Sequence, residues 1–462
     1  MAHVLIFPLP LQGPINGMLR LAEILCLQHI NITFIITQHI HRRLLHSSDI
    51  QVKYHDTFHF QTVPDGLPEE HPRTIFEFSE LMQSLGAVAP SILRKMLTST
   101  DAGKQVSCII ADGLLTFATD IAAEIGIPLL YFDTISPSAI WTYMCLPKLI
   151  QAGELPFKDD NLDETIRNIR GMEGIMRRRD LPDFCRTMNF KDPQVDLVLK
   201  QVHHMPISQG LILNTFQHLD ALVLFQMLKL CPNIYAIGPL HTHLQSSDII
   251  SSSIWQEDRS CISWLDKQPS NSVVYVSIGS LSFMTKDEFL EILHGLVSSG
   301  SRFLWVRRPG SDPVSNEEIP TKLLRGIKDR GCTVSWAPQR EVLAHRAVGG
   351  FLTHSGWNST LESIVAGKPM ICWPHYVDQQ VNSRYVGEVW RLGLDMKDIC
   401  DRVVVEKMVR EIMELKKDTF LERAREMADA ARLSVSEGGS SNADLGRLIN
   451  DIKNMNLCTK SN

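Results

Sequence analysis

The sequence contains no cysteine pattern typical of a metal site or a disulfide framework. Its ten cysteines are spread singly from Cys26 to Cys458, with no CxxC pair and no cluster of histidine and cysteine. No apolar run approaches the roughly 18 residues that a membrane-spanning helix needs. An apolar strand from residue 3 leaves no room for a secretory signal. We therefore expect free thiols, no metal, no membrane contact and a cytoplasmic location.

Basic charge is not in excess either. The sequence has 46 lysines and arginines against 52 acidic residues, for a formal net charge of −6. A nucleic-acid partner requires a basic surface. The densest basic runs, residues 41–43 and 177–179, are short enough to be solvated surface charges. We therefore expect small-molecule partners, no nucleic acid and a monomer.

Two nucleotide-binding fingerprints are also missing, since neither GxGxxG nor a Walker A box occurs, which disfavours a dinucleotide oxidoreductase. Two similar openings are present instead, HVLIFPLPLQG at residues 3–13 and SVVYVSIGSLS at residues 272–282. Each is an apolar strand that enters a glycine-bearing loop before a helix. In a chain of 462 residues they predict two facing, doubly wound, Rossmann-like α/β domains with a ligand cleft between them.

The periodicity between and after these openings supports this division. Short apolar runs predict buried parallel strands at residues 32–37, 106–112, 129–132, 273–278, 303–306, 333–336, 350–353 and 369–373. Helical spacing is found at residues 75–97 and 114–125 and over roughly the last 60 residues. A serine-rich, irregular stretch follows residue 240.

We accordingly divide the chain into four parts. An N-terminal, acceptor-binding domain is expected at residues 1–240, followed by a linker at residues 241–255. A C-terminal domain that binds a nucleotide sugar is expected at residues 256–440. A C-terminal helix at residues 441–462 is expected to pack back on the first domain.

The segment that starts at Trp336 carries the densest group of binding side chains. Trp336 offers a plane on which a base can stack, and Gln339 can bind its polar edges. The turn at residues 354–360 presents His354, Asn358 and Ser359 at a helix start, where free N–H groups bind phosphate.

Further along, Glu362 can accept hydrogen bonds from a vicinal diol, and Asp378 and Gln379 suit sugar hydroxyls. Each residue alone is explained more simply by packing or by helix capping. Their combination describes a nucleotide sugar.

Residues 336–379 resemble the signature box of the plant secondary-product UDP-glycosyltransferases, in length and in nearly all of its fixed letters. The resemblance covers essentially the whole chain, including residues 111–128 and 171–182, and is greatest to the group that glucosylates small terpenoid and iridoid acceptors. It implies the GT-B fold and inverting transfer of glucose from UDP-glucose to a small lipophilic acceptor. No cofactor is implied beyond that donor.

The resemblance also implies roles for individual residues. Those that would hold UDP are Ser280, Trp336, Ala337, Gln339, His354, Trp357, Asn358, Ser359 and Glu362. Those that would hold the hexose are Thr134, Asp378 and Gln379, and glutamine in the last place is the family's usual mark of glucose over galactose. The acceptor pocket is expected near Pro14, Phe117, Trp141 and Met144.

The first loop departs from the family pattern. There the family reads Gln-Gly-His, and the histidine takes the acceptor's proton while a nearby aspartate orients it. This sequence reads Gln12-Gly13-Pro14 and keeps the aspartate as Asp112. A positioned general base contributes about 10²–10⁴-fold to the rate. Proline itself is favoured in the first turn of a helix, so Pro14 is readily explained as scaffold.

Three interpretations of the missing histidine remain open. The acceptor is already an anion, such as a carboxylate with a pKa of about 4–5, and the product is then a glucose ester. Alternatively, Asp112 or Asp133 takes the proton, although Asp133 is more simply explained as a surface or capping residue. In the third, the protein has lost glycosyl transfer and binds a nucleotide sugar or catalyses a different reaction of a small metabolite.

Overall fold

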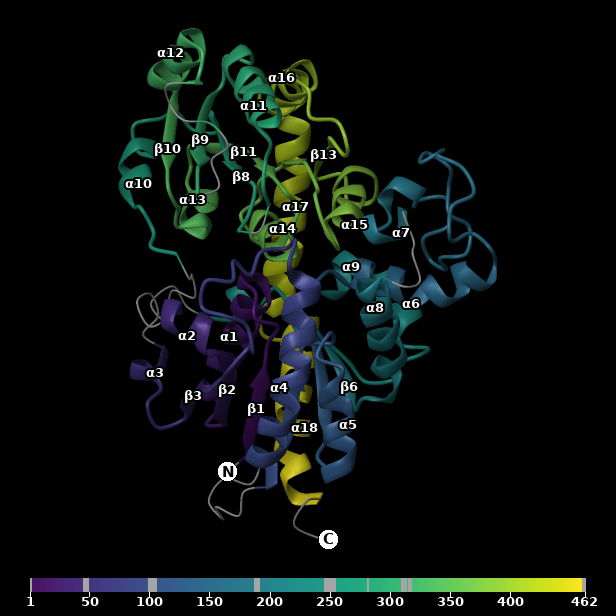
Figure 1. Cartoon of the computed structure of the whole chain (residues 1–462). Coiled ribbons are helices and arrows are strands. Elements are labelled where there is room, and N and C mark those ends of the chain that lie inside the picture. The colour runs from purple at the N-terminus through teal and green to yellow at the C-terminus, as the bar shows by residue number, and fades with distance from the viewer. Residues whose placement is uncertain are drawn as a thin grey trace.

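The computed structural model describes residues 2–44, 50–98, 106–186, 192–244, 255–280, 282–308, 314 and 318–458 (Figure 1). Within these ranges the chain forms two parallel sheets, each covered by helices, and the two α/β units lie one above the other in this view. The two doubly wound, Rossmann-like domains expected from the two strand–loop–helix openings are confirmed. Residues 245–254 of the expected linker lie outside the described part of the chain.

The first sheet has seven strands in the order β3-β2-β1-β4-β5-β6-β7. Its strands are β1 (His3–Phe7), β2 (Asn31–Thr37), β3 (Phe58–Val63), β4 (Cys108–Ala111), β5 (Leu129–Asp133), β6 (Gly210–Leu213) and β7 (Ile234–Ala236). The strand order reverses between β1 and β4, where Phe7 and Ala111 are in register. Ligands of open α/β sheets bind outside such a switch point, and the loops that carry Pro14 and Asp112 begin there.

The second sheet has six strands in the order β10-β9-β8-β11-β12-β13. Its strands are β8 (Val273–Ser277), β9 (Arg302–Val306), β10 (Gly331–Val334), β11 (Val348–Thr353), β12 (Met370–Cys372) and β13 (Gly393–Asp395). The corresponding switch point lies between β8 and β11. The loops that follow these two strands carry Ser280 and His354.

The helices cover both sheets. Those of the first unit are α1 (Gln12–Leu27), α2 (Gln38–Leu44), α3 (Ile50–Lys53), α4 (Phe78–Thr98), α5 (Phe117–Ile125), α6 (Pro137–Gln151), α7 (Asp183–Arg186), α8 (Pro193–His204) and α9 (Gln217–Met227). Those of the second are α10 (Ser260–Leu265), α11 (Lys286–Ser298), α12 (Thr321–Arg330), α13 (Gln339–Ala344), α14 (Trp357–Val365), α15 (Gln379–Arg384) and α16 (Arg402–Arg410). No helix of the described ranges is both long and apolar enough to span a bilayer.

Two long helices, α17 (Lys417–Val435) and α18 (Ser440–Cys458), end the chain. They run from the second unit down to the first (Figure 1). Leu448 and Ile452 are fully buried in the same core cluster as Val4 of the first sheet. The Tyr235 hydroxyl donates a 2.7 Å hydrogen bond to Asp451. The last helix is therefore part of the core of the first domain.

The strand expected at residues 333–336 is shifted. The structure has this strand, β10, at Gly331–Val334, so Trp336 lies in the loop that follows it. Strands β3, β6, β7 and β13 were not expected from the sequence. Three of them have only three or four residues, too few for an alternating pattern to develop, and β3 is an edge strand with exposed His59 and Gln61.

An ion network joins the two units at Asp180, whose side chain is fully buried. Arg177 contacts its carboxylate at 2.9 Å, and Lys397 and Arg384 of the second unit do so at 2.9 and 3.4 Å. Burial alone would raise the pKa of Asp180, but the charges of Lys397 and Arg177 outweigh it and lower that pKa. The expectation of solvated surface charges at residues 177–179 is therefore wrong for Arg177, because this buried carboxylate requires cations around it.

Candidate functional site

The turn between β11 and α14 holds the imidazole of His354 between two glycines. A Cβ atom on Gly279 or on Gly356 would lie 2.5 Å from His354 Nε2. Gly279 also has φ +77°, which other residues rarely adopt. Burial first, and then the charge of His375, lower the pKa of His354 to about 3, so the imidazole is neutral at pH 7. A neutral ring thus lies beside the N-terminus of α14, whose first N–H groups can bind phosphate.

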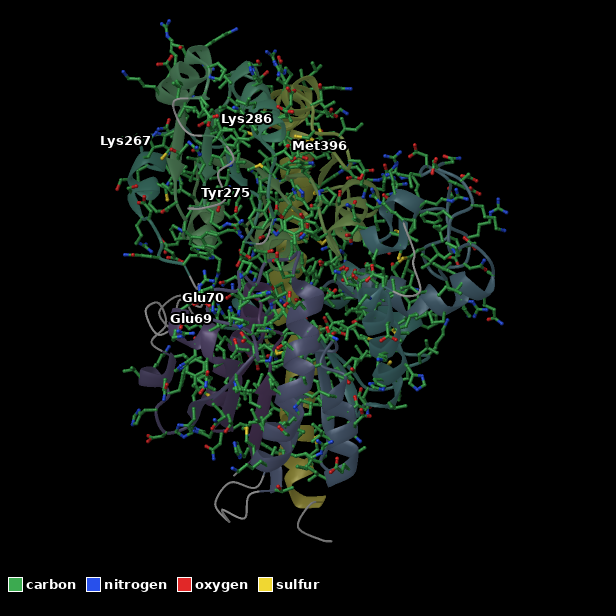
Figure 2. The ribbon with its side chains drawn as sticks, viewed as in Figure 1. Glu69, Glu70, Lys267, Tyr275, Lys286 and Met396 are labelled. Carbon is green, nitrogen blue, oxygen red and sulfur yellow. The ribbon has the colours of Figure 1, made fainter. Side chains whose placement is uncertain are left out.

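Gln339 connects three of the residues assigned to the nucleotide. Its Nε2 donates to Glu362 Oε2 at 2.8 Å and to Ser359 Oγ at 2.9 Å. Its Oε1 accepts from the hydroxyl of Tyr275 at 3.2 Å, and Tyr275 lies inside the second unit (Figure 2). Burial raises the pKa of Glu362. These contacts fix the amide at the start of α13 beside the carboxylate of Glu362 on α14.

Trp336 lies half-buried at the end of β10, before the buried Ala337. Its ring stacks on Trp255, with 5.9 Å between centroids and 29° between planes. The Arg43 guanidinium of the first unit lies 4.7 Å from the centroid of Trp255. The aromatic plane assigned to the base thus faces the boundary between the units.

The first turn of α14 also contacts the first unit directly. Asn358 Nδ2 donates to the carbonyl of Gly13 at 2.9 Å, and Trp357 Nε1 donates to the carbonyl of Asn214 at 2.8 Å. The indole of Trp357 is 3 % exposed, and its single donor is used in this contact. The structure therefore gives these two residues a role in joining the units.

The residues assigned to the hexose come from both units. Gln379 begins α15, and its Oε1 accepts from the backbone N–H groups of His375 and Tyr376 at 2.9 and 3.1 Å. The preceding Asp378 is buried, which raises the pKa of its carboxyl to about 6. Thr134, which follows β5, is buried against Gly17 of α1.

Pro14 is the third residue of α1, and it is half-buried. The first bond of the helix runs from Ile15 N to Leu11 O at 3.1 Å. Residue 14 thus precedes the first helical hydrogen bond, and the missing N–H of proline costs no helical bond. The backbone N–H of Asp112 donates to Phe7 O at 3.0 Å, which places this aspartate at the root of the same loop.

Asp112 and Asp133 form a buried pair beneath this loop. Only 4 % of Asp112 and 3 % of Asp133 are exposed, so the interpretation of Asp133 as a surface residue was wrong. Asp133 Oδ1 accepts from Gly113 N at 3.1 Å and from Gln201 Nε2 at 2.9 Å. Burial raises the pKa of both carboxyls, and the charge of Asp133 raises that of Asp112 further. Such a pair retains a proton to higher pH than a solvated carboxyl does.

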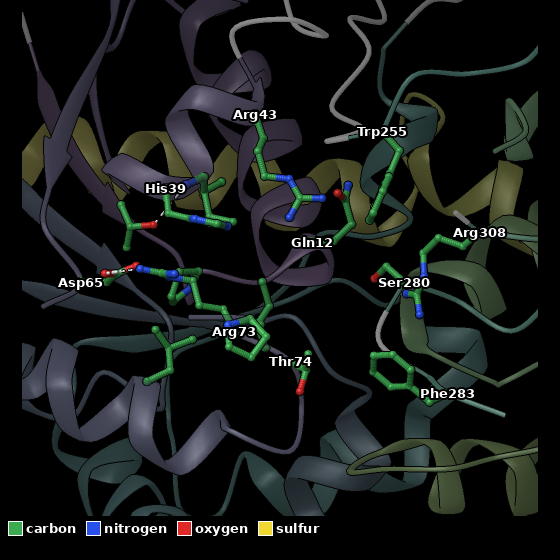
Figure 3. A pocket seen from close by; sticks show the side chains of 16 residues that line it. Gln12, His39, Arg43, Asp65, Arg73, Thr74, Trp255, Ser280, Phe283 and Arg308 are labelled. Atoms are coloured by element: carbon green, nitrogen blue, oxygen red, sulfur yellow. Dashed lines mark hydrogen bonds and ion pairs between the residues drawn. The ribbon is translucent and has the colours of Figure 1, made fainter. Parts of the chain in front are cut away.

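A cavity of about 220 Å³ lies between the two units (Figure 3). The first unit contributes Gln12 and the two residues before it, residues along α2, and residues of the loop after β3. The second contributes Ser280, Phe283 and Arg308. Of the residues expected around the acceptor, Pro14 lies two positions from Gln12 but is not in the lining. Trp141 and Met144 belong to the core of the first unit, and the partly buried Phe117 packs against it.

The charged residues of the cavity were not expected to form a site. Arg43, Arg73 and Arg308 line it, together with Asp65 and Trp255. The sequence offers one signal for this site, the basic run at residues 41–43, but the run does not indicate that Arg43 faces the cavity.

Comparison with known proteins gives consistent results. The family model described as "UDP-glucoronosyl and UDP-glucosyl transferase" matches residues 213–420. The chain is 48% identical to 7-deoxyloganetic acid glucosyltransferase from Catharanthus roseus, over 98% of each chain. It is 44% identical to myricetin 3-O-rhamnoside 1,2-glucosyltransferase from Crocosmia x crocosmiiflora, over 98% of this chain and 96% of the relative. The structure of Os79 from O. sativa in complex with UDP superposes with a TM-score of 0.83, at 27% identity, over 97% of this chain and 100% of that chain.

Proposed function

Because the chain belongs to the UDP-glucosyl transferase family, we propose that it transfers glucose from UDP-glucose to a small terpenoid acceptor of the iridoid type. The observation that carries this proposal is the 48% identity over 98% of both chains with an enzyme named for glucosylating 7-deoxyloganetic acid. The hydrogen bonds from Gln339 of α13 to Ser359 and Glu362 of α14 support it.

The donor is proposed to lie along the second unit. Trp336 stacks on the uracil, and Glu362 accepts from the ribose hydroxyls. His354 and the N-terminus of α14 bind the diphosphate, where a neutral imidazole and backbone N–H groups donate hydrogen bonds to developing charge. Asp378 and Gln379 bind the hexose from the start of α15.

In the proposed reaction an acceptor oxygen attacks the anomeric carbon from the face opposite UDP. The bond from that carbon to the diphosphate oxygen breaks, and UDP leaves with the electron pair. The product has inverted configuration, as a β-glucoside or a β-glucose ester. A hydroxyl acceptor must also lose its proton, whereas a carboxylate has none to lose.

Asp112 is the proposed proton acceptor for a hydroxyl substrate. It lies at the root of the loop where the family carries its base, and burial raises its pKa, which makes its ionised form a stronger base than a solvated carboxylate. A pre-ionised acceptor remains the alternative route, and it needs no base.

The test is turnover of UDP-glucose by the purified chain against carboxylic, phenolic and alcoholic acceptors, with 7-deoxyloganetic acid among them. We expect release of UDP together with an equal amount of glucoside. The His354→Ala variant serves as the control without a diphosphate site. UDP binding without transfer to any acceptor would favour a protein that has lost glycosyl transfer.

We further propose that the protein acts as a cytoplasmic monomer and uses no metal or cofactor besides its donor. The nine cysteines whose side chains the structure describes are free thiols, as expected in a reducing compartment.

A further inference from the structure

The lining of the interdomain cavity carries more positive than negative charge. Three arginines line it, Arg43, Arg73 and Arg308, against one carboxylate, Asp65. Arg73 pairs with both oxygens of that carboxylate, because its Nε and Nη2 donate to Asp65 at 2.8 and 3.1 Å. Arg73 also donates to the carbonyls of Leu67 and His71. Arg73 therefore holds the loop after β3 in place, and its guanidinium neutralises the charge of Asp65.

Arg43 and Arg308 come from opposite sides of the cavity (Figure 3). Arg43 projects from α2 of the first unit and lies over the ring of Trp255. Arg308 follows β9 of the second unit, is 7 % exposed, and donates to the carbonyl of Ser282 at 2.9 Å. Burial lowers the pKa of both guanidinium groups, and the charge of Arg43 lowers that of Arg308 further. Two partly desolvated cations thus face one space, where an anion would be bound favourably.

The rest of the lining suits a small molecule with an apolar body. Pro10, Leu11, Pro72, Leu81 and Phe283 offer apolar surface. Gln12, Thr37, Thr74 and Ser280 offer polar groups. Gln12 belongs to the first loop and Ser280 to the loop assigned to the diphosphate, so the cavity lies between the place of the missing base and the donor.

We propose that this cavity binds the acceptor, and that Arg43 and Arg308 bind a carboxylate on it. The proposal rests on the proposed function, since it takes the cavity beside the first loop as the acceptor site. The same two cations would also suit the diphosphate of UDP, because Ser280 borders both sites. The experiment therefore separates an acidic acceptor from the donor as the source of the anion.

The test compares 7-deoxyloganetic acid with its methyl ester, which keeps the apolar body and removes the charge. With saturating UDP-glucose we expect kcat/KM to favour the acid by more than about tenfold. Arg43→Gln should lower kcat/KM for the acid by about 10- to 100-fold, the usual effect of a lost charge-assisted hydrogen bond, and leave the ester within about twofold. Arg43 is half-buried, and the one carboxylate of the cavity, Asp65, pairs with Arg73. Removing the charge of Arg43 therefore leaves no carboxylate unpaired there, and the variant should keep the wild-type melting temperature.

The matched control is Arg42→Gln. Arg42 is the preceding residue of α2, is exposed, pairs with Glu69 and does not line the cavity. It carries the same charge at nearly the same place, so a general electrostatic effect on the acid would be equal in the two variants. We expect the kinetics of Arg42→Gln to match the wild type for both substrates.

Three results would overturn the proposal. One is equal turnover of acid and ester by the wild type. Another is an Arg43→Gln variant that loses both substrates equally and binds UDP more weakly, which would assign the cations to the diphosphate. If no acceptor is glucosylated at all, the proposed function fails. Calorimetry of the acid against the UDP-loaded protein then tests the carboxylate site separately. Binding of the acid that Arg43→Gln abolishes would uphold the carboxylate site, and no binding would overturn it.

Discussion

The side-chain amide of Asn358 donates a 2.9 Å hydrogen bond to the backbone carbonyl of Gly13. The helix start assigned to the diphosphate is thereby joined to the loop in which related enzymes carry their general base. In this chain the next residue of that loop is Pro14. The hydrogen bond uses the backbone carbonyl of Gly13 and no atom of residue 14. A substitution at residue 14 is therefore expected to act on proton transfer without displacing the donor site.

Pro14→His should raise glucosylation of alcohol acceptors, by up to about 10²–10⁴-fold, because it places an imidazole beside Asp112. Initial rates with an alcohol and with a carboxylic acid measure the effect, and the acid should gain little. Pro14→Ala is the control for the loss of the proline ring alone. An unchanged rate with alcohols would mean that the acceptor's proton does not leave through the first loop.

Gly279→Ala should weaken UDP binding by at least about tenfold. The added Cβ would lie 2.5 Å from His354 Nε2 and would displace the imidazole from the phosphate site. Gly300→Ala is a matched control, because Gly300 has a similar φ of +75° but no atom within 4 Å of the added Cβ. Both variants carry the backbone cost of about 1–2 kcal/mol, and calorimetry with UDP should distinguish them. Equal affinities would remove His354 from the proposed donor site.

Asp133→Asn should alter how stability depends on pH. The pKa of Asp133 is raised in the folded chain, so the folded protein keeps a proton that the unfolded chain releases above about pH 4. The free energy of unfolding should therefore fall as the pH rises from about 4 through the raised pKa of the Asp112–Asp133 pair. Asparagine preserves the oxygen that accepts from Gly113 and removes one of the two charges.

Urea unfolding at pH 5 and at pH 8.5 measures this change. The variant should gain stability relative to the wild type at pH 8.5 and not at pH 5. Asp160→Asn, at an exposed aspartate, provides the reference for an ordinary loss of one carboxylate. A variant whose stability runs parallel to the wild type at both pH values would contradict the assignment of a repelling pair.

Asp180→Asn should destabilise the fold by about 3–5 kcal/mol, because it leaves Lys397 and Arg177 without the buried carboxylate that they surround. The pKa of Asp180 is lowered in the folded state, so its contribution is present above about pH 4 and disappears as the pH falls below that value. Denaturant unfolding at pH 7 measures the loss. Asp159→Asn, which removes an exposed partner of Arg178, should stay close to the wild type.

Most residues assigned to the donor could be grouped from the sequence because they lie close together in it. Trp336 and Gln379 lie within one segment, and its order of strand, turn and helix places the side chains at the ends of neighbouring strands. The cavity between the two units could not be predicted in this way, because Arg43, Arg73 and Arg308 come from three distant segments that only the tertiary fold brings together.

Residue type alone does not predict burial. Trp141 and Met144, which were assigned to the acceptor pocket, are buried in the core cluster of the first unit, and Trp141 donates its indole N–H to Arg170 O at 2.7 Å. Asp180 belongs to a run that looks like surface charge, yet its carboxylate is wholly enclosed. Neither periodicity nor composition predicts whether a long side chain is buried in the fold.

The final helix α18 has a practical consequence for protein engineering. Its apolar side chains, Leu448 and Ile452 among them, complete a core whose other members are encoded more than two hundred residues earlier. A chimaera that exchanges only the N-terminal domain between relatives would combine the first sheet of one enzyme with the α18 helix of another. Chimaeras that exchange the N-terminal domain together with α18 should therefore express as folded protein more often than chimaeras with a single crossover at the linker.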